Sequence, residues 1–201
     1  AASDVYKRQI VIVGPTASGK TEASITISKI FNCDIISADS RQFYKEMTIG
    51  TAKPTKKELN EANHHFINNI SVEDKYSSGI FSREANSFLS NYFLENDYAI
   101  LVGGSGLFID SVIYGLDDMP KVPESFRNDL NELFKKEGIE YLLEKLKTSD
   151  PKYFEIVDKK NHRRVIRALE IIQYTNKPYS SYLTNKKKNM NNYSLRLYGL
   201  C

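Results

Sequence analysis

Ile10-Val11-Ile12-Val13-Gly14-Pro15-Thr16-Ala17-Ser18-Gly19-Lys20-Thr21 joins four apolar residues directly to a glycine-rich loop, and this stretch decides the fold. Residues 14–21 match the pattern G-x-x-x-x-G-K-[ST] in full, between an apolar strand and the start of a helix. The glycines let backbone N–H groups turn inward, the helix N-terminus adds partial positive charge, and Lys20 adds a full one. All eight loop residues are therefore predicted to bind a diphosphate or polyphosphate group, with the Thr21 hydroxyl placed to ligate Mg²⁺. An ordinary glycine turn is the alternative.

Three more short apolar stretches indicate strands, at residues 34–38, 98–102 and about 194–200. A helix is expected over residues 20–31, and a later helix is expected to begin at a Ser82 cap. The inner side of the first helix is expected to carry Ala23, Ile27, Ile30 and Phe31. This alternation of strands and helices with short turns predicts an α/β fold, a P-loop NTPase-like doubly wound parallel sheet.

The pattern changes after about Gly115, where helix signals follow one another without strands. Pro123 and Pro151 indicate helix starts, Gly138 a helix end, and Asn161 the cap of a helix that reaches residue 175. The predicted domains are a P-loop core over 10–116, a helical insertion domain over 117–190, and a return strand of the core over 191–201, in which the chain stops. Residues 1–9 show no periodic pattern and are expected to be a disordered tail or an artefact.

Composition and charge argue against a membrane-spanning protein and against a disulfide scaffold. The formal net charge is only +3, which does not by itself indicate nucleic acid, although the positive charge is concentrated after residue 120. The lysine run 186–188 is expected to be a solvated loop. The longest apolar runs have the length of a strand, so no membrane span is expected. Cys33 and Cys201 are the only cysteines, which favours a reduced, cytoplasmic compartment over a disulfide scaffold.

The carboxylate nearest the predicted loop is Asp39, at the C-terminal end of the second strand. Nucleotide hydrolases place an acidic Mg²⁺ ligand after a core strand, but here residues 98–102 run into Gly103-Gly104-Ser105-Gly106. Ligands of parallel sheets sit at the carboxyl edge, so Asp39 is suited to act as a base or to hold a metal-bound water. A turn cap is the alternative. His64-His65 is expected to be a polar loop or strand start, because no further ligand at metal spacing accompanies it.

Four further motifs carry a resemblance to a known family. They are Ile36-Ser37-Ala38-Asp39-Ser40-Arg41-Gln42, Ile49-Gly50-Thr51-Ala52-Lys53-Pro54, Leu101-Val102-Gly103-Gly104-Ser105-Gly106-Leu107-Phe108 and Arg163-Arg164-Val165-Ile166-Arg167-Ala168-Leu169-Glu170. Together with the loop at 14–21 they resemble the tRNA dimethylallyltransferase (tRNA isopentenyltransferase) family, from about residue 10 to the last residue. Ser105 and Phe108 depart mildly from the family pattern, which favours Thr and Tyr there. The family continues beyond residue 201, so we expect a fragment that is weakly active or inactive.

The resemblance implies transfer of a dimethylallyl group from dimethylallyl diphosphate to N6 of the adenosine next to the anticodon of a tRNA, with Mg²⁺. The P-loop then holds the leaving pyrophosphate, Asp39 acts as the general base, and Thr16 contacts substrate near the reacting centre. The flipped-out adenosine is expected to pass residues 40–42 on entry. The residues expected to contact tRNA here are Asp39, Ser40, Arg41, Gln42 and Ser105. For Arg41 and Gln42 a surface polar role is the alternative.

The resemblance also implies that the helical insertion binds the anticodon stem-loop of the tRNA. The protein is expected to be a monomer. The candidate RNA contacts there are Arg127, Arg163, Arg164 and Arg167. Arginines that are solvated, or paired with Glu170, are the alternative. Two other functions remain open: a P-loop kinase of a small hydroxylated metabolite, similar to shikimate kinase, and a non-catalytic RNA-binding fragment.

Overall fold

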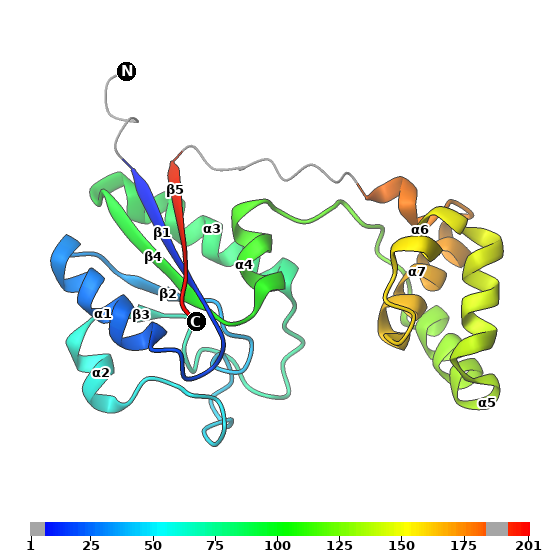
Figure 1. Ribbon diagram of the computed structural model, residues 1–201, viewed down its shortest axis with the longest axis horizontal. Coiled ribbons are helices and arrows are strands. Elements are labelled where there is room, and N and C mark those ends of the chain that lie inside the picture. The colour runs from blue at the N-terminus through cyan, green and yellow to red at the C-terminus, as the bar shows by residue number, and fades with distance from the viewer. Residues whose placement is uncertain (1–6, 184–192) are drawn as a thin grey trace. The chain divides into compact units, whose positions relative to one another are not determined.

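The computed structural model describes residues 7–183 and 193–201, and the chain divides into two compact units (Figure 1). The first unit combines residues up to 116 with those from 187 onward, and the second covers residues 117–186. A membrane-crossing helix, which would have to be both long and apolar, is absent from the part of the chain that the structure describes.

The first unit is built on one parallel sheet in the order β3-β2-β4-β1-β5. Its strands are β1 (Arg8–Val13), β2 (Ile35–Ser37), β3 (His64–His65), β4 (Tyr98–Gly103) and β5 (Ser194–Gly199). β1 pairs with β4 on one side and with β5 on the other, so the last strand lies beside the first (Figure 1). The predicted α/β class is confirmed. β1 begins at Arg8, two residues before the expected start, because Arg8 pairs with both Tyr98 and Ser194.

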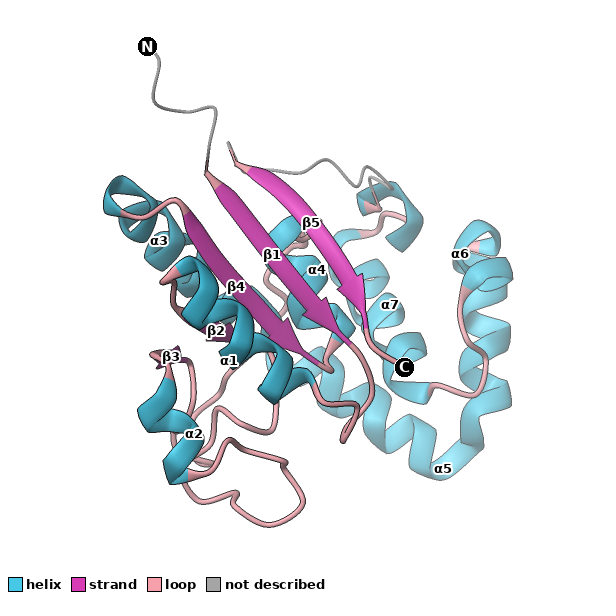
Figure 2. Cartoon of the chain, turned by 60° about the vertical axis from the view of Figure 1, so that its left-hand side comes forward, coloured by secondary structure: helices cyan, strands magenta, loops and turns pink. Residues whose placement is uncertain are grey.

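Helices cover both faces of this sheet, as Figure 2 shows. On one face α1 (Lys20–Phe31) packs on an apolar cluster that includes Ile12, Ile35 and Ile100. On the other, α3 (Ser78–Glu95) and α4 (Gly106–Ile113) pack on a cluster that includes Val11, Ile36 and Leu101. The two clusters alternate along each strand, because successive strand residues point to opposite faces. The short α2 (Lys56–Glu61) begins with a capping box formed by Thr55 and Glu58.

The expected inner face of α1 was wrong in part, since Ile27 packs on the cluster but the end of the face does not, and one expected helix cap was wrong. In α1 the buried residues include Ser24 and Ser28, whereas Ile30 and Phe31 are 69% and 41% exposed. The hydroxyls of these serines donate to the backbone oxygens of Thr21 and Cys33, which satisfies them in the buried position. Ser82 is not a cap either. α3 is capped by Ser77, five residues earlier, and the buried Ser82 hydroxyl donates to Ser111 O.

The second unit is helical. It contains α5 (Glu124–Ser149), α6 (Pro151–Ile156), α7 (His162–Thr175) and the 3₁₀ turn Tyr179–Tyr182. Gly138 has φ 81° and interrupts α5, and the Asn161 side chain caps α7 by accepting from Arg164 N. The core consists of residues from α5 and α7, with Val157 between them: Leu130, Leu142, Leu146, Val157, Val165, Ile166, Ala168 and Leu169. The lysine run 186–188 lies within residues 184–192, outside the described part.

Candidate functional site at the carboxyl edge of the sheet

The loop at 14–21 connects β1 to α1 in a shape that requires its glycines. A Cβ atom on Gly14 would lie 2.6 Å from Leu200 O and 2.7 Å from Ser18 Oγ, both shorter than real contacts allow. Gly19 has φ 82°, a left-handed conformation that side chains disfavour, directly before the first residue of α1. The Lys20 ammonium donates to Pro15 O and so folds back over the loop.

The loop has several exposed residues and one buried hydroxyl group without a hydrogen-bond partner. Pro15, Thr16, Ala17 and Gly19 are exposed. The Ser18 hydroxyl is buried and has no hydrogen-bond partner among the described residues. A loop with backbone N–H groups, a lysine and an unused hydroxyl can accept an anion, because an incoming oxygen supplies the missing partners.

A cavity adjoins the loop at the carboxyl edge of the sheet. Its lining combines residues from α1, from the end of β2, from the segment around β3 and from the end of β4: Lys20, Thr21, Ser24, Ser37, Asp39, Gln42, Pro54, His64, Ile67, Val102 and Gly103. Four of the residues predicted from the sequence, Lys20, Thr21, Asp39 and Gln42, thus meet around one space. Thr16, Ser40, Arg41 and Ser105 are not among the lining residues.

Asp39 owes its position to close packing of β2 against β4. Ala38 N donates to Val102 O, and a Cβ on Gly103 would lie 2.4 Å from Ala38 O, so only glycine fits there. The Asp39 carboxylate accepts from Arg41 N at 3.0 Å through Oδ1. This turn contact uses one carboxylate oxygen while the residue still lines the cavity, so the turn-cap role and a chemical role are compatible.

The residues after Asp39 are held by hydrogen bonds to the neighbouring turns and loops. Ser105 Oγ accepts from Ser40 N at 3.1 Å, which joins the turn after β4 to the turn after β2. Gln42 accepts from Ser37 Oγ at 2.9 Å and donates to Ala52 O at 2.9 Å. Arg41 is exposed. Gln42 therefore holds the loop around residue 52 against the sheet, a role that its sequence neighbours alone do not indicate.

Lys53 holds the same loop in place, a structural role that the sequence did not indicate. Its ammonium donates to Tyr44 O at 2.5 Å and to Asn68 Oδ1 at 2.7 Å. Partial burial lowers the pKa of this ammonium.

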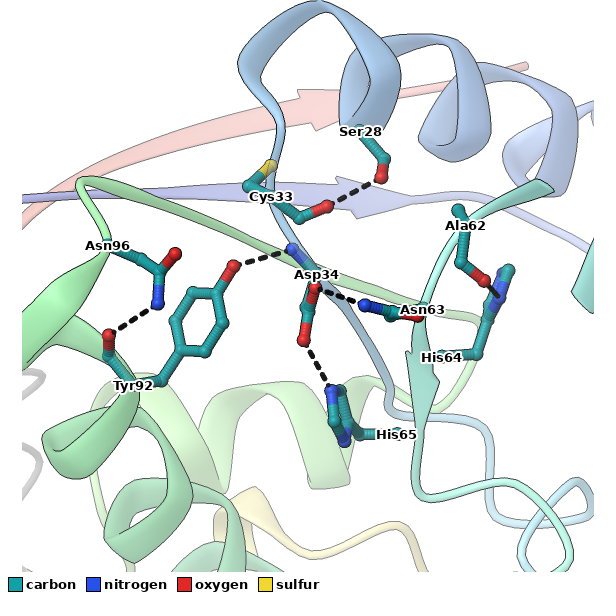
Figure 3. Close-up of polar contacts among 9 residues, drawn as sticks. All are labelled: Ser28, Cys33, Asp34, Ala62, Asn63, His64, His65, Tyr92 and Asn96. Carbon is teal, nitrogen blue, oxygen red and sulfur yellow. Dashed lines mark hydrogen bonds and ion pairs between the residues drawn. The ribbon is translucent and has the colours of Figure 1, made fainter. Parts of the chain in front are cut away.

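His64 is a cavity residue that the sequence did not indicate. β3 is only two residues long, and its histidines diverge: His64 lines the cavity, whereas His65 Nε2 lies 2.8 Å from Asp34 Oδ2 (Figure 3). His65 also packs on the Phe88 ring, with centroids 4.2 Å apart. Strand alternation applied to the pair His64-His65 is the one sequence signal that separates these two roles.

Within the described residues, no group of three His, Cys, Asp or Glu side chains is arranged to hold a metal ion. The residues present nevertheless fit Mg²⁺, because this ion is commonly bound through one or two protein oxygens together with substrate phosphates. Thr21 lies on the first turn of α1 and lines the cavity, where its hydroxyl oxygen can serve in that way.

The candidate RNA-binding arginines of the helical unit fall into two pairs. Arg127 Nε and Nη2 donate to the two carboxylate oxygens of Glu170, and Arg167 Nη1 donates to the same carboxylate. Burial raises the pKa of Glu170, but the hydrogen bonds from both guanidinium groups outweigh this, and the net pKa lies below its ordinary value. Arg163 and Arg164 are exposed.

Comparison with known proteins places these features in a family. Residues 42–201 match the family model described as IPP transferase. The tRNA dimethylallyltransferase of Flavobacterium johnsoniae is 46% identical over 200 residues, covering 96% of this chain and 64% of that protein. The tRNA dimethylallyltransferase of Christiangramia forsetii is 50% identical over 182 residues, covering 90% and 60%. The chain thus spans less than two thirds of the length of these relatives.

Solved structures that are similar to this chain belong to the same family. The full-length tRNA isopentenylpyrophosphate transferase of Bacillus halodurans is 37% identical with a TM-score of 0.55, and the match covers 86% of this chain and 57% of that one. A eukaryotic dimethylallyltransferase acting on tRNA is 26% identical with a TM-score of 0.76, covering 96% and 48%. The P-loop, the Asp39 turn and the sheet order described above therefore occur in a chain that belongs to the IPP transferase family.

Proposed function

We propose that this chain provides the catalytic core for transfer of a dimethylallyl group from dimethylallyl diphosphate to N6 of the adenosine adjacent to the anticodon in tRNA. The observation that carries the proposal is the shared cavity: the anion-binding end, Lys20 and Thr21, and the carboxylate of Asp39 line the same space. The family match and the names of the relatives favour this reaction over the kinase and the non-catalytic alternatives.

In the proposed reaction the allylic C–O bond of the diphosphate breaks and a C–N bond to the exocyclic nitrogen forms. Pyrophosphate leaves, and its charge is stabilised by the backbone N–H groups of residues 14–21 and by Lys20. Mg²⁺ held at Thr21 would add further positive charge at the leaving group. Asp39 accepts the proton that the amine releases, which helps because the amine lone pair is delocalised into the ring; such base catalysis contributes about 10²–10⁴-fold.

Thr16 is exposed on the loop and is therefore accessible for the proposed contact with substrate. Ser40, Arg41 and Ser105 surround the turn after Asp39 and form the proposed entry for the base. In the helical unit, Arg163 and Arg164 have exposed side chains that suit phosphate contacts. We further propose that the protein acts as a monomer in the cytoplasm, where Cys33 and Cys201 remain free thiols.

The deciding experiment incubates the chain with labelled dimethylallyl diphosphate, Mg²⁺ and an anticodon stem-loop, and measures label in the RNA. A parallel reaction offers ATP and small alcohols. Label transfer that depends on the target adenosine supports the proposal. ATP turnover stimulated by an alcohol, without label in the RNA, would establish the kinase instead.

A further inference from the structure

Ile49 is the most exposed large apolar side chain among the described residues, with 96% of its surface accessible. It lies in the loop of residues 45–54, between the Asp39 turn and α2. Single apolar side chains on a protein surface are common and need no explanation by themselves. Ile49 differs from them because the backbone around it is held in place, so its exposure does not result from a loose chain.

Side-chain hydrogen bonds hold this loop from its base to its tip. At the base, Lys53 Nζ donates to Tyr44 O at 2.5 Å and so joins the two ends of the loop. Near the tip, the buried Thr51 hydroxyl donates to Thr48 O at 3.2 Å. This bond closes the turn over residues 48–51, which carries Ile49.

The backbone of the tip is also strained. Gly50 has φ 72° and Ala52 has φ 47°, both in the left-handed region. Glycine adopts this conformation freely, but an alanine is strained there and keeps it only where the surroundings impose it. Here Gln42 Nε2 donates to Ala52 O at 2.9 Å. Strain that is maintained in this way is concentrated at sites that bind ligands.

The same glutamine connects the loop to the candidate site. Gln42 lines the cavity together with Asp39 and Pro54, and Pro54 is the last residue of the loop. The backbone N–H of Gln42 donates to Asp39 O at 3.0 Å. The loop that carries Ile49 is therefore part of the border of the site.

The charged side chains around the loop suit RNA. Lys45 at its start, and Lys56 and Lys57 just after its end, are exposed. The nearby carboxylates of Glu46 and Glu58 already accept hydrogen bonds from backbone N–H groups. Lysines before and after an apolar tip are complementary to a ligand that presents phosphates and flat apolar bases together.

A target adenosine that reaches Asp39 must first leave the base stack of its RNA, which costs free energy and opens a gap between the flanking bases. Isoleucine is one of the apolar side chains that proteins insert between stacked bases. We propose that Ile49 packs against the bases that flank the target adenosine and so acts as a wedge that keeps the adenosine out of its stack. This inference rests on the proposed function, because only an extruded base requires a wedge.

The first test compares binding of two anticodon stem-loops to the whole chain. One stem-loop has both bases next to the target adenosine, and in the other these two positions are abasic. Ile49→Ala should weaken binding of the first stem-loop by roughly tenfold, the effect of losing most of the apolar contact of one isoleucine. The abasic stem-loop offers no base to pack against, so wild type and Ile49→Ala should bind it equally.

A second measurement follows extrusion directly and needs no turnover. 2-Aminopurine at the target position becomes more fluorescent when it leaves the stack. Saturating wild-type protein should raise this fluorescence, and saturating Ile49→Ala protein should raise it less. Ile49→Leu keeps the apolar bulk and should give the wild-type rise.

Leu94→Ala is the matched control, because Leu94 is 78% exposed near the end of α3, shortly before the amino end of β4. It lies away from the carboxyl edge of the sheet, so this variant should match the wild type in both measurements. The Ile49 side chain buries almost no surface in the free protein, so its variants should unfold at the wild-type temperature.

Three outcomes would contradict the inference. Ile49→Ala protein that binds the first stem-loop and extrudes the base as well as the wild type overturns the wedge and leaves the proposed function standing. Equal weakening on both stem-loops also overturns it, since the contact would then not be with the flanking bases. Wild-type protein that gives no rise in fluorescence does not extrude the target base, which overturns the proposed function together with the wedge.

Discussion

Arg127 donates from Nε and Nη2 to the two carboxylate oxygens of Glu170 at 2.7 Å each, so that one bidentate ion pair joins α5 to α7. Glu170 is only 1% exposed, and Arg167 donates to the same carboxylate. The core of the helical unit therefore contains a buried charge whose partners lie 43 and 3 residues away. Two candidate RNA contacts are at the same time structural residues.

Glu170→Gln should destabilise the helical unit by about 1–3 kcal/mol, because it removes the charge from the hydrogen bonds that the buried carboxylate accepts, while Arg127 and Arg167, with side chains 53% and 36% exposed, remain solvated. Urea denaturation followed by helical circular dichroism measures the effect. Glu132→Gln is the matched control, since Glu132 pairs with Lys135 on the surface and should cost at most about 1 kcal/mol. Equal losses in both variants would mean that the buried pair is energetically unimportant.

Glu170 also gives the wild-type chain an acid-sensitive stability. Its pKa in the folded state lies below its ordinary value of 4.5. The stabilising contribution is therefore complete above the unfolded-state pKa and is lost as the pH falls through the folded-state pKa. The free energy of unfolding of the wild type should decline below about pH 5 more steeply than that of Glu170→Gln. Parallel acid profiles would contradict this.

Gly103→Ala should destabilise the sheet by about 1–3 kcal/mol, the usual cost of overpacking. The added Cβ would meet the Ala38 backbone at 2.4 Å, and neither strand can move without breaking the β2–β4 ladder. Gly106→Ala is the control, because open space surrounds that position at the start of α4. Thermal unfolding of both variants measures the effect. A Gly103→Ala variant that unfolds at the wild-type temperature would contradict the close contact between Gly103 and the Ala38 backbone.

Lys20→Ala should weaken binding of dimethylallyl diphosphate by roughly 10- to 100-fold, since it removes a charged hydrogen-bond donor from an anion site. Calorimetric titration measures this without any turnover. Lys29→Ala is the control on the same helix, because Lys29 pairs with Glu61 in the last turn, away from the loop. If Lys29→Ala reduces the affinity as much as Lys20→Ala does, the loss comes from the lower net charge of the protein and not from a contact made by Lys20.

Asp39→Asn should retain the fold and the affinity for diphosphate but lose on the order of 10²-fold or more in prenyl transfer, as expected for a general base. The asparagine oxygen can still accept from Arg41 N, so the turn is preserved. Single-turnover transfer of label to a stem-loop is the measurement. A rate near the wild-type value would remove Asp39 from the chemistry.

Arg163→Ala combined with Arg164→Ala should weaken stem-loop binding and reduce its salt dependence, with a slope change of about one for each RNA phosphate that the protein no longer neutralises. Both side chains are exposed, so stability should not change. Lys135→Ala provides a control for overall charge at an exposed position of α5. Affinities that match the wild type at several salt concentrations would make these arginines ordinary surface charges.

The sequence by itself determined the features that depend on neighbours along the chain. The helix expected over residues 20–31 is α1 with the same ends, and Asn161 caps α7 through its side chain as predicted. Capping and backbone turns are local, because their hydrogen bonds span three or four residues. The apolar run before Gly14 likewise predicted a buried parallel strand, since only a strand covered on both faces has no polar side.

Only the tertiary structure decided the features that depend on partners far along the chain. Ser24 and Ser28 are buried while Ile30 is exposed, and the two serine hydroxyls donate to backbone oxygens, which helical periodicity does not reveal. His64 reaches the cavity only because β3 pairs with β2, and Arg127 is bound by a glutamate 43 residues later. Such contacts are set by packing between elements, where burial forces each polar group to find a partner wherever the fold provides one.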